Sequence, residues 1–457
     1  MKKFFRVLFP LLLSSLFLGG CSEQQSFLPD VFSGPTVSQD EQSSEDESSV
    51  SIYVETRADY IARIDGYERK YYVRKLSDHQ LKYFSIIYDQ VKNFQTNIDF
   101  GANIQADDLD LLLYLLNYDC PELIQINGDY APKYVNEAHT IVSGVVLSAS
   151  MDSEFYTAAV HKLNSTAQSI EKKLEDKTDA EREKFVYDYI FNNTVYNEVS
   201  SHAGSVYGVL VEHKGRCEGM SKAFMWMMNR LGYECICVVG KPLWQNESVF
   251  DTHCWNIVRL DDQYYHVDIT ADNINLTAPN NNPPTYGFYN VCDDFIYTSR
   301  TPEKIFDEMG IPECTDNTKD YHKRHRLYIP KKETEQEVKT AFYQILTDRT
   351  VNDEIHNIPI KLEDKDNYDA LVEKYNQYLH DYLIEHYTEP YEYTVFSNNI
   401  SQTVIVNAVL QNPPPEPSSS SDSLSSPEDS ASELPQEQSS SDEETETVSA
   451  EDTVETS

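Results

Sequence analysis

Apolar residues recur at two different spacings along this chain. A repeat every three or four residues places them on one face of an α-helix, and strict alternation places them on one face of a β-strand. The helical spacing predicts helices over residues 81–91, 109–118, 153–174, 179–192, 218–231, 334–346 and 368–386. The alternating spacing predicts strands over residues 142–148, 255–260, 263–269, 358–362, 391–396 and 403–410.

This mixture of elements predicts an α+β fold with three parts. We expect an N-terminal α/β region over residues 51–134, a central domain over 135–300 and a smaller C-terminal α+β module over 301–411. The predicted strand 142–148 then falls in the central domain. Asp179, with carboxylates in the following turn, is the expected cap of the helix that begins there.

The chain begins with a basic segment and a short apolar run from Val7 to Leu18. This pattern is typical of an export signal and is too short for a stable membrane-spanning helix. It ends in Leu18-Gly19-Gly20-Cys21, which resembles a bacterial lipobox. The resemblance implies that residues 1–20 are removed and that a lipid on Cys21 anchors the protein to the extracellular face of the cell membrane. An ordinary cleaved signal, or an uncleaved one, is the alternative.

Both flanks of the body are acidic and poor in apolar residues. Residues 22–50 hold seven acidic residues and no basic one, and residues 412–457 hold thirteen with no Lys or Arg. Such segments bury too little apolar surface to offset ordering, so we expect a disordered tether over 21–50 and a disordered tail over 412–457. Since the chain carries a formal net charge of −39, nucleic acid is excluded as a partner.

The eight cysteines are at positions 21, 120, 217, 235, 237, 254, 292 and 314. Disulfides are compatible with an extracellular location, but a body of this size has ample core without them, so we expect most of the thiols to be buried apolar groups. One alternative is a zinc site made of Cys235, Cys237, His253 and Cys254. The ligand types fit, but the spacing is not that of common zinc fingers. We therefore expect no metal and no cofactor.

A cysteine opens the helix predicted over 218–231, in the segment Gly215-Arg216-Cys217-Glu218-Gly219. The apolar residues of that helix form one stripe, so one side is buried and Cys217 lies at its N-terminus. The helix dipole and unsatisfied amides there favour a thiolate, and the N–H of Cys217 can face an oxyanion. The flanking glycines are expected to let backbone and substrate approach closely. A buried, inert cysteine is the more common case when such a residue stands alone.

Two residues downstream supply what a thiol nucleophile needs. If Asp261-Asp262 form a two-residue turn, His253 lies opposite Thr270 and diagonal to Asp268 on the same face of a hairpin. A carboxylate there can reach the imidazole, fix its tautomer and stabilise the imidazolium. A register slip of one residue would put the two side chains on opposite faces. Each residue alone is unremarkable, but after a helix-start cysteine they indicate a nucleophile, its base and the base's orienter.

The order and spacing of Cys217, His253 and Asp268 resemble the transglutaminase-like superfamily over roughly residues 181–273. The resemblance implies a papain-like core in which these residues are the catalytic triad. It also implies that Tyr207 could complete an oxyanion hole, although core packing would explain that residue equally well. For Trp255 it implies a role in shielding the thiolate–imidazole pair, with simple packing as the alternative.

The implied function is a membrane-tethered extracellular thiol enzyme that acts on amide bonds of proteins or peptides. The acyl group would pass through a thioester on Cys217 to water or to an amine. Arg216, where the family commonly has an apolar residue, could stabilise the thiolate or bind an acidic substrate. The alternative is a catalytically idle surface lipoprotein of the same fold that binds peptides or cell-wall components.

Overall fold

The computed structural model describes residues 55–243, 252–272, 283–363, 368–398 and 400–411. The predicted signal peptide, the lipid on Cys21, the acidic tether and the acidic tail lie outside these residues and stay predictions. Within the described residues, no helix is both long and apolar enough to cross a membrane. The fold is α+β, as predicted.

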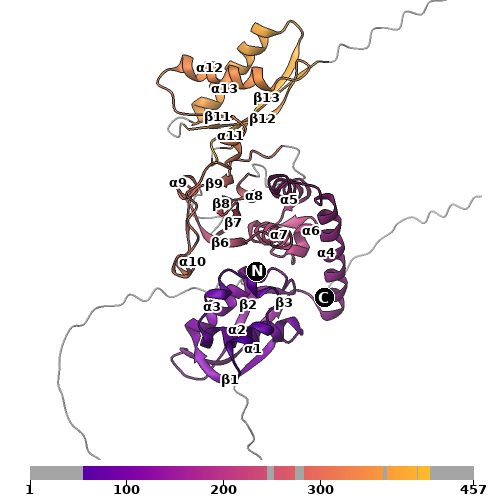
Figure 1. The fold of residues 1–457 in the computed structure, drawn as a ribbon, viewed down its shortest axis with the longest axis vertical. Coiled ribbons are helices and arrows are strands. Elements are labelled where there is room, and N and C mark those ends of the chain that lie inside the picture. Colours follow the sequence, from indigo (N-terminus) through magenta and orange to yellow (C-terminus); the bar gives the residue numbers. More distant parts are fainter. Residues whose placement is uncertain (1–54, 244–251, 273–282, 364–367, 399, 412–457) are drawn as a thin grey trace, which may run out of the picture. The chain divides into compact units, whose positions relative to one another are not determined.

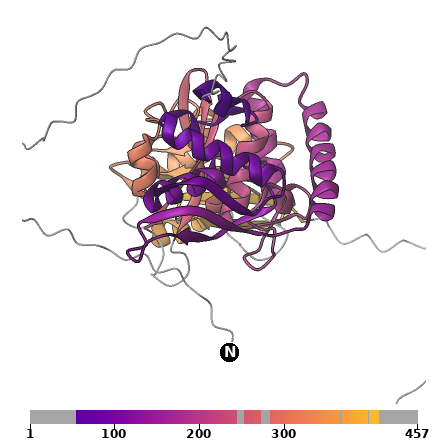
Figure 2. The ribbon, with the colours of Figure 1, turned by 90° about the horizontal axis from the view of Figure 1, so that it is seen from below.

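The N-terminal region packs its helices on a three-stranded antiparallel sheet, seen among the indigo and purple elements of Figure 2. Its helices are α1 (Arg57–Ala62), α2 (Asp78–Lys92) and α3 (Ala106–Tyr118), with 3-10 turns at Tyr67–Arg69 and Val73–Lys75. Its strands, in the sheet order β1-β3-β2, are β1 (Asn97–Gln105), β2 (Ile126–Tyr134) and β3 (Ile141–Ala149).

The strand predicted over 142–148 therefore belongs to this sheet, and its assignment to the central domain was wrong. As β3 it is the middle strand and pairs with β1 on one side and β2 on the other. Those two neighbours were not predicted because few of their residues are buried: three of the nine in β1 and none in β2. Without visible partners, the apolar pattern of β3 could only be assigned to the domain that comes after it in the chain.

The central part is a five-stranded antiparallel sheet with helices packed against it (Figure 1). The sheet order is β10-β6-β7-β8-β9, and α7 packs on β6 and β7. Its strands are β6 (Cys235–Pro242), β7 (His253–Leu260), β8 (Gln263–Val267), β9 (Tyr289–Val291) and β10 (Arg300–Pro302). Two short strands, β4 (Val195–Tyr196) and β5 (Lys214–Gly215), form a separate parallel pair. The helices are α4 (Ser153–Lys173), α5 (Asp179–Asn193), α6 (Val206–Leu210), α7 (Cys217–Arg230), α8 (Ile269–Asp272), α9 (Asp293–Ile296) and α10 (Lys304–Met309).

Two local predictions in this part need correction. The N-cap of α5 is Thr178, not Asp179, because the Thr178 hydroxyl accepts from the N–H of Glu181, whose carboxylate returns to Thr178. The strand predicted over 263–269 ends earlier, at Val267. Asp268 then accepts a hydrogen bond from the N–H of Ala271 at 3.0 Å, which starts the turn of α8 instead.

The hairpin of β7 and β8 has the predicted register. Its pairs run from Asn256 opposite Val267 to Leu260 opposite Gln263. The two residues of the turn, Asp261 and Asp262, both have positive φ, at 48° and 65°. This is the type I′ geometry that matches the twist of a two-residue hairpin, and it places His253 and Asp268 on one face.

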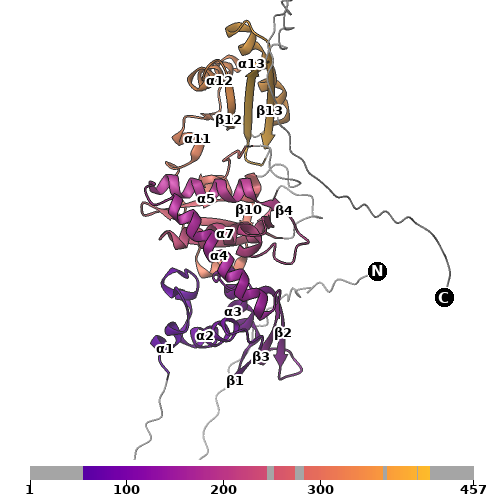
Figure 3. The ribbon, with the colours of Figure 1, turned by 90° about the vertical axis from the view of Figure 1, so that its right-hand side faces the viewer.

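The C-terminal module is a separate four-stranded sheet with two long helices on one face (Figure 3). Its elements are α11 (Tyr321–Arg324), β11 (Tyr328–Ile329), α12 (Glu335–Arg349), β12 (Ile355–Leu362), α13 (Tyr368–His386), β13 (Tyr391–Asn398) and β14 (Thr403–Leu410), in the sheet order β11-β12-β14-β13. It has its own hydrophobic cluster, between Leu327 and Ala408. The N-terminal region and the central part instead share one cluster, from Tyr60 to Cys314.

Candidate active site

Cys217 is the first residue of α7 and is half-buried. Arg216 before it is extended, with φ −100°, and forms the N-cap without a side-chain hydrogen bond to the helix amides. The first amides of α7 therefore have no capping side chain, and they point toward the end where the thiol lies. The structure therefore places the thiol at a helix N-terminus, the position that the sequence predicted for it.

Polar side chains tie the first turns of α7 to the sheet. The Ser221 hydroxyl donates to the carbonyl of Cys254 at 2.9 Å. The Asn256 amide donates to the carbonyls of Ser221 at 2.9 Å and Ile236 at 3.1 Å. Because all of these groups are buried, the bonds fix the start of the helix relative to the start of β7.

His253 and Asp268 meet inside the protein. Nε2 of His253 lies 2.6 Å from Oδ2 of Asp268, and both side chains are buried. Since Asp268 occupies Nε2, Nδ1 is the nitrogen left for Cys217, with which His253 also makes a hydrogen bond. The structure thus brings together the three residues that the sequence singled out.

The charge state of His253 is set by these partners. Burial lowers the pKa of the imidazole, but the charge of Asp268 and its hydrogen bond, together with the interaction with Cys217, outweigh burial and raise that pKa to about 9. The imidazole is therefore protonated at neutral pH. The Cys217 side chain therefore has a cation as its hydrogen-bond partner.

Arg300, on β10, is a partner of Asp268 that the sequence did not reveal. Its guanidinium is fully buried and forms an ion pair with Oδ2 of Asp268. It also lies over the rings of Phe288 and Trp255, 4.5 and 5.4 Å from their centroids. Burial would raise the pKa of Asp268, but the charges of His253 and Arg300 outweigh it, so that pKa lies below its ordinary value. No local pattern marks Arg300, because the contact spans 32 residues.

Trp255 is fully buried beside the histidine. Its ring stacks with that of His253 at a centroid distance of 6.3 Å and an interplanar angle of 16°. Its indole N–H donates to Nδ1 of His266 at 3.1 Å. The side chain is therefore held by His253, Arg300 and His266, and a shielding role remains a prediction.

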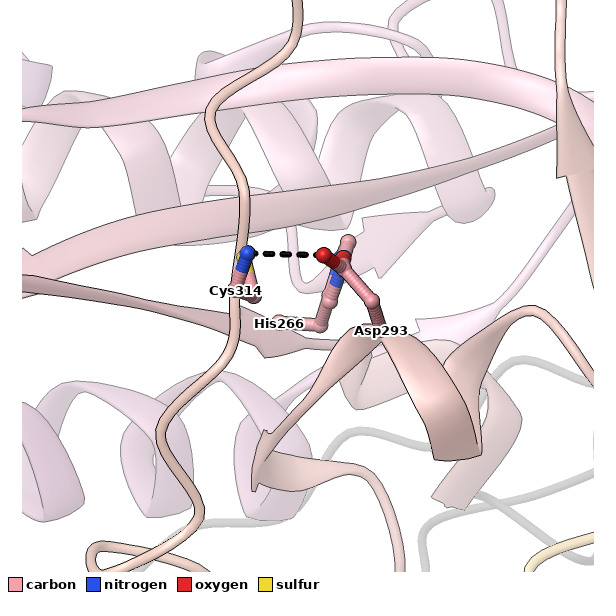
Figure 4. Close-up of side chains that lie close together, drawn as sticks. All are labelled: His266, Asp293 and Cys314. Atoms are coloured by element: carbon pink, nitrogen blue, oxygen red, sulfur yellow. Dashed lines mark hydrogen bonds and ion pairs between the residues drawn. The ribbon is translucent and has the colours of Figure 1, made fainter.

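The hydrogen bond from Trp255 also determines what His266 can do. His266, Asp293 and Cys314 place ligand atoms within 4.8 Å of one another (Figure 4). Because Nδ1 of His266 accepts from Trp255, Nε2 carries the proton and donates to Asp293 at 2.8 Å. Burial also lowers the pKa of His266, which favours this neutral form. Both ring nitrogens are in use, so these residues do not suit a metal ion.

The zinc site considered from the sequence does not form. In the described residues, the cluster at His266 is the single group of three or more ligand side chains close enough for an ion. His253 and Cys254 are neighbours on β7 and so face opposite sides of the sheet. All seven cysteines of the described segments are free thiols, and burial raises the pKa of Cys235 and Cys254 well above the usual value.

Cys217 and His253 open into a cavity of about 430 Å³. Its wall includes Tyr118 from α3, so the N-terminal region contributes directly to the site. A second cavity of about 230 Å³ shares Arg216 and Glu218 with the first. Remaining lining residues of the first cavity are Tyr196, Glu198, Val239, Thr252 and Cys254.

The buried carboxylate of Glu218 lines both cavities and holds three polar side chains around it. Glu218 accepts from Arg216 at 2.5 Å on one oxygen, and from Lys222 at 2.7 Å and Asn117 at 2.9 Å on the other. Burial would raise its pKa, but the charges of Lys222 and Arg216 lower it to about 2. Arg216 is therefore engaged by Glu218, although its side chain keeps 38% exposure at the cavity.

Tyr207 lies elsewhere. It is buried in α6, where its ring packs edge-on against Phe155 at 5.7 Å and His202 at 5.6 Å. It does not line the cavity that holds Cys217, as far as the described residues define that cavity. The structure therefore supports the packing alternative for Tyr207 and not the oxyanion role.

The glycines beside Cys217 also have a structural reason of their own. A Cβ on Gly219 would lie 2.1 Å from the carbonyl oxygen of Ala203, and one on Gly215 would lie 2.6 Å from the Val209 side chain. Both positions need glycine because α6 and the segment before it pack against them. The expectation that they make room for substrate is not needed to explain them.

Comparison with known families agrees with this geometry. Residues 164–269 match the family model described as the transglutaminase-like superfamily. This segment contains Cys217, His253 and Asp268, so the chain includes a transglutaminase-like domain, as its sequence predicted. Members of this superfamily include cysteine proteases and acyltransferases.

Solved structures show only a weak likeness. A transglutaminase ("TGase") shares 17% identity over 38% of this chain and 50% of its own, with a TM-score of 0.22. A protein from Cytophaga hutchinsonii, provisionally titled a cysteine protease, shares 12% over 31% and 61%, with a TM-score of 0.21. One from Parabacteroides distasonis, provisionally titled a protease, shares 13% over 31% and 34%, with a TM-score of 0.19.

The chain thus spans less than two thirds of each of these proteins, and TM-scores this low carry no argument about function. Comparison with curated proteins finds no match. Any activity must therefore be inferred from the residues themselves.

Proposed function

We propose that this protein is a thiol enzyme that cleaves or transfers amide acyl groups through a thioester on Cys217. One observation carries the proposal. The 2.6 Å contact between His253 and Asp268 leaves the other imidazole nitrogen for Cys217, which lies at the start of α7 on the same cavity. A nucleophile, a base and an orienter in this relation are what acyl transfer requires.

In the proposed reaction the Cys217 sulfur attacks the amide carbonyl carbon. The C–S bond forms, and the carbonyl π electrons move to oxygen. When the C=O bond re-forms, the C–N bond breaks and the His253 imidazolium gives its proton to the leaving nitrogen. Asp268 holds the imidazole in place throughout. Water, deprotonated by the now neutral His253, then releases the acid.

Hydrolysis is the favoured outcome over transfer to an amine. Cys217 is half-buried and the Arg216 side chain is 38% exposed at the cavity, so solvent reaches the thioester. Water at its bulk concentration then competes well with any amine that lacks a binding site of its own. The proposed substrate is a protein or peptide outside the cell.

The lipobox-like ending at Cys21 supports placing this enzyme on the extracellular face of the cell membrane. The test is detergent partition of the mature protein, with Cys21 as its first residue. Cys21→Ala should release the protein or leave its precursor unprocessed. Sequencing a mature N-terminus at any other residue would overturn the lipid anchor while leaving the enzyme proposal standing.

The enzyme proposal is tested on the thiol itself. Cys292, which is also half-buried, is the matched control for Cys217. At pH 6–7 iodoacetamide should label Cys217 well before Cys292, and His253→Ala should remove the difference. Para-nitrophenyl acetate should give a burst of acylation on Cys217 that Cys217→Ala abolishes and Cys292→Ala leaves intact.

A Cys217 that reacts no faster than Cys292 and gives no burst would overturn the enzyme proposal. An idle core that binds peptides or cell-wall components would then be the better account. The natural acyl donor can be sought by trapping it on Cys217 in intact cells and identifying the adduct by mass spectrometry.

A further inference from the structure

Acyl transfer develops negative charge on the carbonyl oxygen, and the cavity must supply donors for it. The N–H of Cys217 is one. Tyr207, the side-chain donor suggested by the family resemblance, lies away from the cavity. Two other phenols, those of Tyr118 and Tyr196, line the cavity together with Cys217.

The two phenols differ in whether their donor is already used. The Tyr196 hydroxyl donates to Glu198 at 3.2 Å. The Tyr118 hydroxyl makes no hydrogen bond within the described residues. Its ring is held firmly all the same, 4.8 Å from the Tyr114 ring and 6.2 Å from that of Phe306, with the Lys222 ammonium 5.5 Å away. A fixed phenol beside a cavity, with an open donor, is suited to a ligand oxygen.

The position of Tyr118 is locked to that of the nucleophile. Its neighbour Asn117 donates to Glu218 at 2.9 Å and accepts from Lys222 at 2.8 Å. Both partners are in the first two turns of α7, the helix that Cys217 begins. The C-terminal end of α3 and the N-terminal end of α7 are therefore joined by partly buried, charge-assisted bonds, which is the preorganisation that an oxyanion donor needs.

We propose that Tyr118 is a catalytic residue whose phenol donates a hydrogen bond to the oxyanion, so that the N-terminal region completes the active site. This inference rests on the proposed function. In the step concerned, the Cys217 sulfur bonds to the carbonyl carbon and the π electron pair moves to oxygen, which accepts the Tyr118 O–H. The phenol keeps its proton, and the bond is released when the C=O bond re-forms and the leaving group departs.

The surroundings of Tyr118 keep it in the donor form. Burial, and after it the negative groups Glu218, Cys254 and Cys217, raise the pKa of this phenol well above its usual value. The O–H is therefore intact across the working pH range. A weakly acidic neutral donor also adds no charge that would have to be compensated.

The test compares Tyr118→Phe with the matched variant Tyr114→Phe. Tyr114 is one turn earlier on α3, its hydroxyl is bonded to Glu303 at 2.6 Å, and it is not among the described residues that line the cavity. Acylation by para-nitrophenyl acetate passes through an oxyanion, whereas alkylation by iodoacetamide does not. Tyr118→Phe should slow acylation by about 10²-fold and leave the alkylation rate of Cys217 unchanged. Tyr114→Phe should change neither rate by more than about twofold.

The possible results distinguish a failure of the Tyr118 proposal from a failure of the thiol-enzyme proposal. A wild-type burst that Tyr118→Phe leaves within twofold would overturn the role of Tyr118 and leave the thiol enzyme standing. Equal slowing of acylation and alkylation would also overturn it, because Tyr118 would then act on the thiolate and not on the oxyanion. If the wild type itself shows no burst, both proposals fail together.

Discussion

Asp268 carries two cations on a single carboxylate oxygen. His253 and Arg300 both bind Oδ2, and all three side chains are buried. The other oxygen accepts from the N–H of Ala271 at 3.0 Å. The carboxylate that orients the histidine is therefore itself oriented, by a strand-edge arginine on one side and a helical turn on the other.

Removing Arg300 should lower the free energy of unfolding. Arg300→Met keeps much of the side-chain volume but leaves Asp268 short of a buried counter-charge, which typically costs about 3–5 kcal/mol. The matched control is Arg259→Met, because Arg259 forms an exposed pair with Asp262 worth about 0–1 kcal/mol. Urea unfolding of both variants gives the comparison. Equal, small losses would show that the buried pair contributes nothing to stability.

The titration of His253 gives a second prediction. With its pKa raised from an ordinary 6.5 to about 9, its stabilising effect on the fold is complete below pH 6.5 and is lost as the pH rises through 9. An NMR titration of labelled histidines should show the His253 midpoint near 9. Cys217→Ala removes one of the raising interactions, so it should lower that midpoint. A midpoint near 6.5 in both proteins would mean that no imidazolium–thiolate pair forms.

At the scale of elements, the register of the hairpin of β7 and β8 determines whether His253 lies beside Asp268. Its register depends on the two-residue turn Asp261-Asp262, in which both residues have positive φ. Asp tolerates this conformation less well than Gly, which has no Cβ to clash. The turn therefore forms with Asp at both positions, although Gly would be more stable in this backbone conformation.

Asp262→Gly should consequently stabilise the protein by about 0.5–1 kcal/mol, after allowing for the greater entropy of unfolded glycine. Asp262→Ala is the matched control: it removes the same exposed pair with Arg259 but keeps a Cβ at φ 65°, so it should destabilise. Thermal melts of the two variants should move in opposite directions. A lower melting temperature for Asp262→Gly would mean that the carboxylate has a role beyond the turn.

The hairpin also shows what the sequence could determine. Alternating apolar residues and a two-residue turn were enough to place His253 beside Asp268, because both signals act within 20 residues of chain. The register was confirmed, and so was the start of α7 at Cys217. The sheet that contains β3 was predicted wrongly, since its partners have little apolar pattern of their own.

Contacts that cross from one part of the chain to another could not be predicted in this way. Arg300 reaches Asp268 from a three-residue strand, and Tyr118 reaches the cavity from α3. Neither has a local pattern that differs from an ordinary buried residue. Only the three-dimensional structure shows that Asp268→Asn would disturb a buried arginine as well as the histidine. That change should therefore destabilise the protein.

At the scale of the whole molecule, the described residues contain two large hydrophobic clusters and a small one of four buried residues. One large cluster joins the N-terminal region to the central part, and the other belongs to the C-terminal module. The acidic tail has no apolar pattern with which to add to either. The stability of the body should therefore be independent of the tail.

Deleting residues 412–457 should accordingly leave the melting temperature within about 1 °C and the acylation rate unchanged. The comparison needs matched salt, because thirteen acidic residues are lost with the tail and long-range repulsion changes with them. A drop of several degrees at both low and high salt would show that the tail docks on the body.

The buried pair of Arg300 and Asp268 has one more consequence, which concerns charge conservation during turnover. In the reaction proposed above, the resting site holds a thiolate, an imidazolium, a carboxylate and a guanidinium, whose charges sum to zero. When the carbonyl is attacked, the negative charge moves from the sulfur to the carbonyl oxygen. When the acyl-enzyme forms, the imidazolium gives its proton to the leaving nitrogen, and the oxygen loses its negative charge as the C=O bond re-forms. The sum stays at zero in each state. Without the guanidinium the interior would hold one uncompensated negative charge throughout, in a protein whose formal charge is already −39. In the proposed reaction, Arg300 therefore keeps the summed charge of these four groups at zero in every state.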